Sequence, residues 1–209
     1  MPITRRLVQL YLGLVLYGVS SALMVRSQLG LDPWDVLHQG VARHTGLSLG
    51  TVAIAVGAVV LLGWVPLRQR PGLGTVSNVV VIGLAVDAAL AVLPPVEGIA
   101  ARVALLVSGV VLNGFATGCY IGARFGPGPR DGLMTGIVRR SGRSVRLVRT
   151  GIEITVVVVG WLLGGTVGIG TVTYALAIGP LVHRFLPLLE AGRRQPRPAP
   201  AVRPVVDLA

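Results

Sequence analysis

Long apolar runs alternate with short polar segments along the whole chain. The apolar runs cover residues 7–25, 52–67, 76–93, 103–121, 152–163 and 172–182. With their flanking residues, most of them reach the roughly 20 positions that a helix needs to cross a bilayer. The pattern therefore predicts an all-α membrane protein with six transmembrane helices.

Composition agrees with this pattern. Hydrophobic residues make up 53% of the chain and charged residues 13%, and the mean hydropathy is +0.76. This apolar content exceeds what the interior of a water-soluble domain of this size can hold. The net charge of +11 comes from arginines in the short segments between apolar runs, where basic residues set membrane orientation. We therefore expect no nucleic-acid partner.

The chain repeats itself at an offset of 96 residues. Between positions 30 and 48, eight of nineteen residues are identical to those 96 positions later. The matched residues are Gly30, Pro33, Asp35, Leu37, Gly40, Arg43, Gly46 and Ser48, paired with Gly126, Pro129, Asp131, Leu133, Gly136, Arg139, Gly142 and Ser144. The repeat predicts two similar units, residues 1–96 and 97–190, each with three long helices and one short polar-rich helix.

Three crossings in each unit would give the two units opposite orientations in the membrane. This inverted arrangement occurs in many secondary transporters. With both termini in the cytoplasm, sixteen arginines lie inside and only Arg26, Arg43 and Arg102 lie outside. That bias favours six crossings and cytoplasmic termini.

The two polar-rich segments, residues 30–40 and 126–136, predict short helices. In the first, Asp32 is a suitable N-cap, Pro33 suits the first helical position, and Asp35 places a carboxylate in the first turn. Asp131 is the counterpart of Asp35. We expect each helix to run for about three turns and to end at Gly46 or Gly142.

Helices of this length are too short to cross the membrane, which leaves two interpretations. If both dip into the bilayer from opposite faces, their N-termini meet and form a polar site for a substrate or ion. Trp34, Asp35, Arg130 and Asp131 are then the candidate binding residues. Alternatively, both helices lie on the membrane surface, with the aspartates as caps and Trp34 as an interfacial anchor.

The pattern Gly30-x-x-Pro33-Trp34-Asp35-x-Leu37, its partial second copy and the chain length resemble the YczE-like proteins, relatives of the YitT group of bacterial membrane proteins. The resemblance covers residues 5–190. It implies a multi-pass protein of the bacterial inner membrane and no catalytic residues. The second copy departs from the pattern, since Arg130 stands where the first copy has Trp34.

Ionisable residues also fall inside apolar runs. Asp87 and His183 are 96 residues apart, and such residues are functional candidates within a membrane. The alternative is that both lie near helix ends and reach the headgroups. Glu153 is spaced to pair with Arg149 at a helix start.

Polar residues recur on the first long helix of each unit, where they can line a pathway or hydrogen-bond between helices. They are Tyr17, Ser20 and Ser21 in the first unit and Asn113, Thr117 and Tyr120 in the second. Glycines on the same two helices, such as Gly13 and Gly109, predict close packing between them. Thr75 and Thr171, in two Gly-x-Gly-Thr turns, are expected to cap the helices that follow.

No sequence motif indicates an enzyme, a cofactor or a metal site, and Cys119 is the single cysteine. We therefore expect a small secondary transporter or permease in the lipid bilayer, with an unidentified small molecule or ion as substrate and with dimerisation possible. The alternative is a non-transporting membrane scaffold or regulatory partner of another complex. That function would use the arginine-rich loop at 139–149 and the basic segment 191–209, which we expect to be a disordered cytoplasmic tail.

Overall fold

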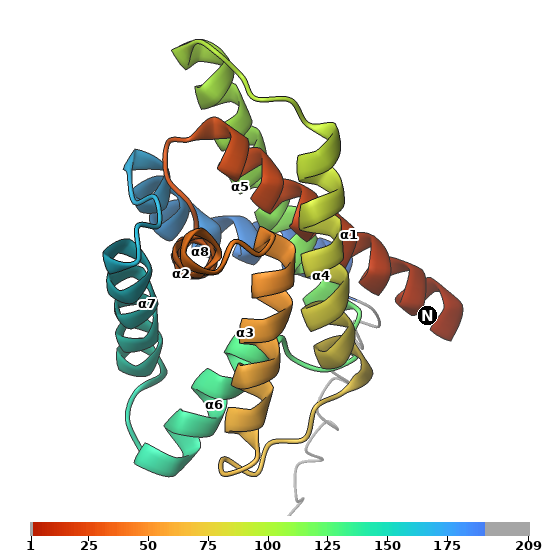
Figure 1. Cartoon of the computed structure of the whole chain (residues 1–209). Coiled ribbons are helices and arrows are strands. Elements are labelled where there is room, and N and C mark those ends of the chain that lie inside the picture. Colours follow the sequence, from red (N-terminus) through yellow and green to blue (C-terminus); the bar gives the residue numbers. More distant parts are fainter. Residues whose placement is uncertain (1, 191–209) are drawn as a thin grey trace, which may run out of the picture.

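The computed structural model describes residues 2–190, and every regular element in that range is an α-helix (Figure 1). The predicted all-α class is confirmed. The expected disordered tail at 191–209 lies outside the described residues. The helices are α1 (Ile3–Ser27), α2 (Pro33–Thr45), α3 (Leu49–Trp64), α4 (Leu73–Val92), α5 (Ile99–Gly122), α6 (Pro129–Ser141), α7 (Val145–Leu162) and α8 (Ile169–Leu189).

The helix order repeats with the sequence. Helix α5 begins 96 residues after α1, and the pairs α2 and α6, α3 and α7, and α4 and α8 have the same spacing. Each half of the described chain thus consists of a long helix, a short helix and two further helices.

The short helices begin and end as their sequences predict. The Asp32 carboxylate caps α2 by accepting from the backbone N–H groups of Trp34 at 2.9 Å and Asp35 at 3.1 Å. Pro33 occupies the first turn. Gly46 and Gly142 follow α2 and α6 in the left-handed conformation, with φ of 70° and 67°.

The threonines contribute to the caps of α4 and α8, as expected, but from the third helical position and not from the cap position itself. Gly72 and Gly168 occupy the cap positions, and the threonine three residues later accepts a hydrogen bond from the glycine N–H. The reason is space: a Cβ on Gly72 would lie 2.5 Å from the carbonyl oxygen of Phe125. Only glycine fits at that position, so Thr75 acts from the helix interior.

Four helices, α1, α4, α5 and α8, are long and apolar enough to cross a membrane. Helices α2 and α3 are bent by 113° at a short break and form either a fifth, broken span or a re-entrant loop. Helix α3 has 16 residues and is therefore about 24 Å long, shorter than the roughly 30 Å hydrocarbon core. Helix α7 carries Arg146, Arg149 and Glu153. The described chain thus contains four or five candidate spans by length and composition, where the apolar pattern predicted six.

Helices α1 and α5 pack side by side at the centre of the molecule (Figure 1), and glycines permit the close approach, as expected. A Cβ on Gly13 would lie 2.7 Å from the Cβ of Cys119, and one on Gly109 would lie 2.8 Å from the Cγ of Met24. Gly18 on α1 faces α4, and its counterpart on α5, Gly114, faces α8. Each contact thus has an equivalent in the other half.

Each short helix packs against the third helix of the other half. A Cβ on Gly40 of α2 would lie 2.6 Å from the carbonyl oxygen of Gly160 in α7, and Gly132 of α6 packs against the ring of Trp64 in α3. The loops that follow α1 and α5 likewise each contact the opposite half. Gly170 donates to the Leu29 carbonyl at 2.7 Å, and Gly74 donates to the Phe125 carbonyl at 2.9 Å. These contacts occur in pairs, one from each half of the described chain.

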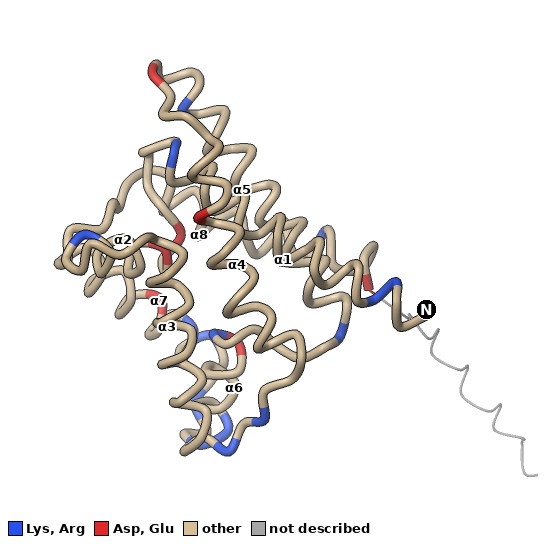
Figure 2. The backbone as a smooth tube through the Cα atoms, turned by 45° about the vertical axis from the view of Figure 1, so that its right-hand side comes forward, with Lys and Arg blue, Asp and Glu red and all other residues tan. Residues whose placement is uncertain are grey.

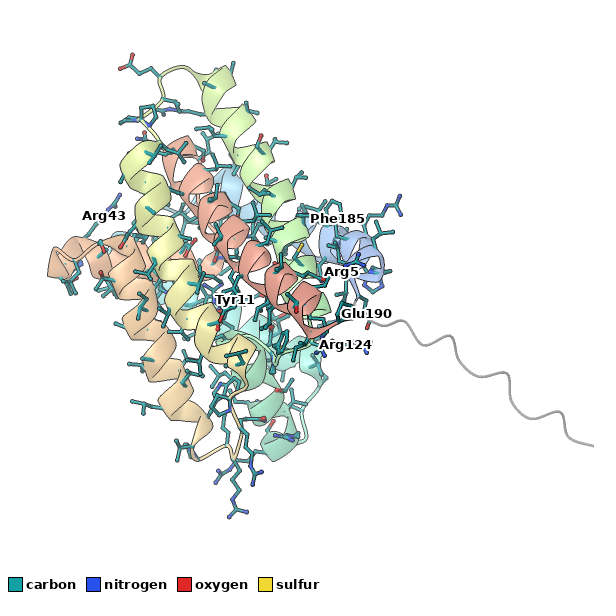
Figure 3. All side chains as sticks on the ribbon, turned by 90° about the vertical axis from the view of Figure 1, so that its right-hand side faces the viewer. Arg5, Tyr11, Arg43, Arg124, Phe185 and Glu190 are labelled. Atoms are coloured by element: carbon teal, nitrogen blue, oxygen red, sulfur yellow. The ribbon has the colours of Figure 1, made fainter. Side chains whose placement is uncertain are left out.

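Apolar side chains such as Leu62, Leu84 and Leu176 are exposed along the helices. Figure 2 shows basic positions around α6 and the turn between α3 and α4, where Arg140 donates to the Pro66 carbonyl at 2.9 Å. In Figure 3, Arg5, Arg124 and Glu190 lie near one another, and Arg43 lies at the opposite side. Exposed apolar surface of this extent is typical of helices that face lipid.

Candidate binding site

A cavity of about 410 Å³ lies where the two short helices begin. Both halves of the chain contribute to its walls. Its polar lining residues are Tyr17, Asp32, Trp34, Asp35, His38, Asn78, Thr117, Tyr120, Arg130, Asp131, Arg149, Glu153, Tyr174 and His183. The remaining lining is largely apolar and includes α3 and α4 positions such as Ala53 and Val79. Volume and lining are typical of a site for a small molecule.

The first turns of α2 contribute a buried acidic group. Asp32 is fully buried, and Asp35 and His38 are each 4% exposed. His38 lies one helical turn after Asp35, and its Nδ1 is 3.0 Å from the Asp35 Oδ1. The other carboxylate oxygen of each aspartate, Oδ2, is buried without a hydrogen-bond partner among residues 2–190. Two buried acceptors therefore remain available beside the cavity.

Arg130 of α6 extends into this acidic group from the other half of the chain. Its Nη1 lies 3.5 Å from the Asp32 Oδ1 and donates to the Tyr17 hydroxyl at 3.4 Å. Its guanidinium carbon lies 4.9 Å from the ring centroid of Trp34, in a cation–π contact. Trp34 and Arg130 occupy equivalent positions, 96 residues apart, so the contact joins the two halves where the short helices begin.

Asp131 lies beside Arg130 in the first turn of α6 and faces α5. The Tyr120 hydroxyl donates to its Oδ2 at 3.2 Å. The rings of Tyr120 and Tyr17 meet edge to face, with centroids 6.4 Å apart. The two tyrosines thus contact neighbouring residues of α6: Tyr120 bonds Asp131, and Tyr17 accepts from Arg130.

The polar residues of α1 and α5 fill both predicted roles: some line the cavity, and others hydrogen-bond between helices. Tyr17, Thr117 and Tyr120 line the cavity. Asn113 hydrogen-bonds between helices instead, since it donates to the Ser20 hydroxyl at 2.9 Å and accepts from the Tyr174 hydroxyl at 3.0 Å. This buried network fixes α1, α5 and α8 against one another.

The structure does not bring Asp87 to the cavity. Its Oδ1 accepts from the N–H of Gly50 at 2.8 Å and its Oδ2 from the Ser48 hydroxyl, so it holds the start of α3. Its equivalent, His183, is exposed and lines the cavity from α8. Glu153 accepts from the Arg149 Nε at 2.9 Å, which confirms the expected pair on α7.

Sequence reasoning missed four residues of this site. Asp32 was interpreted only as a helix cap, and His38, Asn78 and Tyr174 were not considered. A signal was present for His38, because a histidine three residues after Asp35 shares its helix face. Asn78 and Tyr174 are also 96 residues apart, so comparing the polar positions of the two halves could have found them.

No group of three or more His, Cys, Asp or Glu side chains in residues 2–190 is placed to hold a metal ion. Within the same range, the cavity combines buried carboxylates, the guanidinium groups of Arg130 and Arg149, and aromatic side chains. Those features suit recognition of an organic molecule by charge and shape. The expectation that the chain has no cofactor stays a prediction.

The fold and the cavity define an all-helical membrane protein with a buried, charged site between two similar halves. The chain belongs to the DUF6198 family, a family of unknown function whose model matches residues 4–187. It is 41% identical over 180 residues to an uncharacterized protein of Haemophilus influenzae, covering 86% of this chain and 83% of that protein. It is 34% identical over 180 residues to the uncharacterized membrane protein YczE of Bacillus subtilis, covering 85% of this chain and 83% of that protein.

The resemblance to the YczE-like proteins is thereby confirmed. A second Bacillus subtilis protein, the uncharacterized protein YyaS, is 26% identical over 183 residues, with 86% of this chain and 91% of that protein covered. No solved structure matches the chain.

Proposed function

We propose that this protein is a small secondary transporter whose substrate binds in the cavity between α2 and α6. One observation carries the proposal: equivalent short helices from the two halves begin at the same cavity, and Arg130 of one contacts Trp34 of the other. Secondary transporters place their sites between structural repeats, where broken helices present N-termini and charged side chains to the substrate.

The proposed topology has six crossings, formed by α1, α3, α4, α5, α7 and α8, and the short helices α2 and α6 enter the membrane from opposite faces without crossing it. Three crossings in each half give the halves opposite orientations. Two features support this. The turn between α3 and α4 lies beside the turn after α6, and both are rich in arginine. Arg6 donates to the Ala123 carbonyl at 3.0 Å, which places the start of α1 near the end of α5. We propose that this side is cytoplasmic, in accord with the positive-inside rule.

Alternating access would then arise from movement of one half relative to the other. Each short helix packs on the third helix of the opposite half, so a rocking motion would open the cavity along one such pair and close it along the other. The Trp34–Arg130 contact joins the halves at the cavity, and its breaking and re-forming would accompany each cycle.

Cysteine accessibility tests this mechanism without knowledge of the substrate. In a background with Cys119→Ala, single cysteines replace Ala53 and Thr117, which line the cavity from α3 and α5. A membrane-impermeant thiol reagent is applied to intact cells and to inverted vesicles. We expect both positions to react from both faces, because the cavity opens alternately to each side.

Ser21→Cys is the matched control, because Ser21 is 1% exposed and does not line the cavity. It should stay unreactive from either face. Reaction of Ala53→Cys and Thr117→Cys from one face alone would contradict alternating access. That result would favour the non-transporting scaffold or regulatory partner, which would then be sought through the arginine-rich loop at 139–149.

A further inference from the structure

The cavity carries more negative than positive side chains. Asp32, Asp35, Asp131 and Glu153 line it together with two arginines, Arg130 near Asp32 and Arg149 paired with Glu153. Two histidines also line the cavity: His38, bonded to Asp35, and the exposed His183 on α8. An incoming cation would improve this balance, and an anion would worsen it.

Two carboxylate oxygens of cavity-lining residues lack a hydrogen-bond donor. The Oδ2 atoms of Asp32 and Asp35 are buried and have no partner within residues 2–190, although each Oδ1 is hydrogen-bonded. A buried carboxylate oxygen without a donor costs free energy. A ligand with two or more N–H groups would satisfy both oxygens at once.

The aromatic side chains that line the cavity also favour a cation. Trp34, Tyr17, Tyr120 and Tyr174 line the cavity beside these oxygens, and aromatic faces attract organic cations. The Arg130 guanidinium lies over the Trp34 ring at 4.9 Å, so the protein's own side chain already occupies a cation position there. Its Nη1 is 3.5 Å from Asp32, longer than the 2.7–2.9 Å typical of a strong charged hydrogen bond.

We propose that the cavity binds a small organic cation, a primary amine or a guanidinium compound, which pairs with Asp32 and Asp35 and displaces Arg130 from Asp32. This proposal adds a substrate class to the proposed transporter function. It rests on that function for the transport step alone, since binding can be measured separately. The cavity of about 410 Å³ holds an amine of roughly drug-fragment size. Arg130 acts as a tethered competitor that closes the site when no cation is bound.

The test is isothermal titration calorimetry on the full chain in lipid nanodiscs, with three probes of matched shape. Benzylamine is the cation, benzyl alcohol the neutral molecule and benzoate the anion. Agmatine and tetramethylammonium extend the cation set, the first with a guanidinium group and the second without N–H donors. We expect saturable binding of benzylamine and agmatine, weaker binding of tetramethylammonium, and none of benzyl alcohol or benzoate.

Variants distinguish loss of the proposed cation site from a general effect on folding. Asp32→Asn and Asp35→Asn should each weaken benzylamine binding by about tenfold or more, and Asn keeps the N-cap function at position 32. Asp87→Asn removes a carboxylate outside the cavity and should leave the affinity unchanged. Arg130→Gln removes the competitor and should strengthen benzylamine binding by about tenfold, which a merely damaged site would not show.

Binding of benzoate in place of the amines would overturn the inference, as would no binding of any cation probe or weaker amine binding by Arg130→Gln. These outcomes differ from a failure of the transporter. If amines bind but the cavity cysteines react from one face alone, the cation site stands and transport fails. If the cysteines react from both faces but amines do not bind, transport stands and the substrate class fails.

Discussion

The guanidinium of Arg130 stacks on the indole ring of Trp34, and these two residues occupy the same position in the two halves of the chain. The repeat thus has different residues at one of the places where its copies meet. In identical copies two tryptophans or two arginines would face each other there, whereas a cation and an aromatic face attract. The sequence difference at this position gives the two halves a cation–π contact beside the cavity.

The Trp34–Arg130 contact should contribute measurably to stability. We expect a double-mutant cycle of Trp34→Leu and Arg130→Gln to give a coupling energy of about 1 kcal/mol, because Trp34 is buried while the Arg130 side chain is 31% exposed. The measurement is the free energy of unfolding in mixed micelles titrated with denaturing detergent. Trp34→Phe keeps an aromatic face and should retain part of the coupling. Additive single-variant effects would show that the stacking contributes nothing.

Gly132→Ala should destabilise the protein by about 1–3 kcal/mol. A Cβ at this position would overlap the Trp64 ring, which is buried and held by its Nε1 donating to the Pro129 carbonyl at 3.0 Å. The same unfolding titration measures the loss. Gly151→Ala is the control, since a Cβ there meets nothing within 4 Å and alanine favours the helix. Equal stability of the two variants would argue against the packing of α6 on α3.

Asp87→Ala should lower the free energy of unfolding by about 1–3 kcal/mol, because the Ser48 hydroxyl and the Gly50 N–H at the start of α3 lose their acceptor. Asp87→Asn keeps an acceptor and should cost less. Thermal unfolding in detergent, measured alongside a benzylamine titration, separates an effect on stability from an effect on amine binding. A change in amine affinity without loss of stability would place Asp87 in the binding site instead.

The topology predicts which turns share a side of the membrane. In the Cys119→Ala background, Arg70→Cys and Ser141→Cys should react with an impermeant reagent in inverted vesicles, and Thr45→Cys and Glu97→Cys in intact cells. All four native residues are exposed, so access is limited only by the membrane. Labelling of position 70 from one side and 141 from the other would rule out the six-crossing topology in which α3 and α7 each cross the membrane.

Much of the architecture follows from local sequence. The apolar runs specify long helices because their backbone polar groups must be satisfied internally in lipid. Asp32, Pro33 and Gly46 specify the short helix α2, since capping and left-handed backbone are properties of the residue itself. The repeat at 96 residues predicted that the halves share one plan, and every pair of helix starts keeps that spacing.

The tertiary structure decided which of the polar residues meet. Asp87 and Asp35 are both candidate binding residues by sequence, yet Asp87 binds the start of α3 while Asp35 borders the cavity, because α4 packs beside α3. Local sequence also does not indicate that α2 packs on α7 and α6 on α3. This packing between the halves brings Arg130 to Asp32, nearly one hundred residues away in sequence, and depends on close approaches at Gly40 and Gly132. Local propensities set each helix, but long-range packing sets the site, because charge pairing requires side chains to be within a few ångströms.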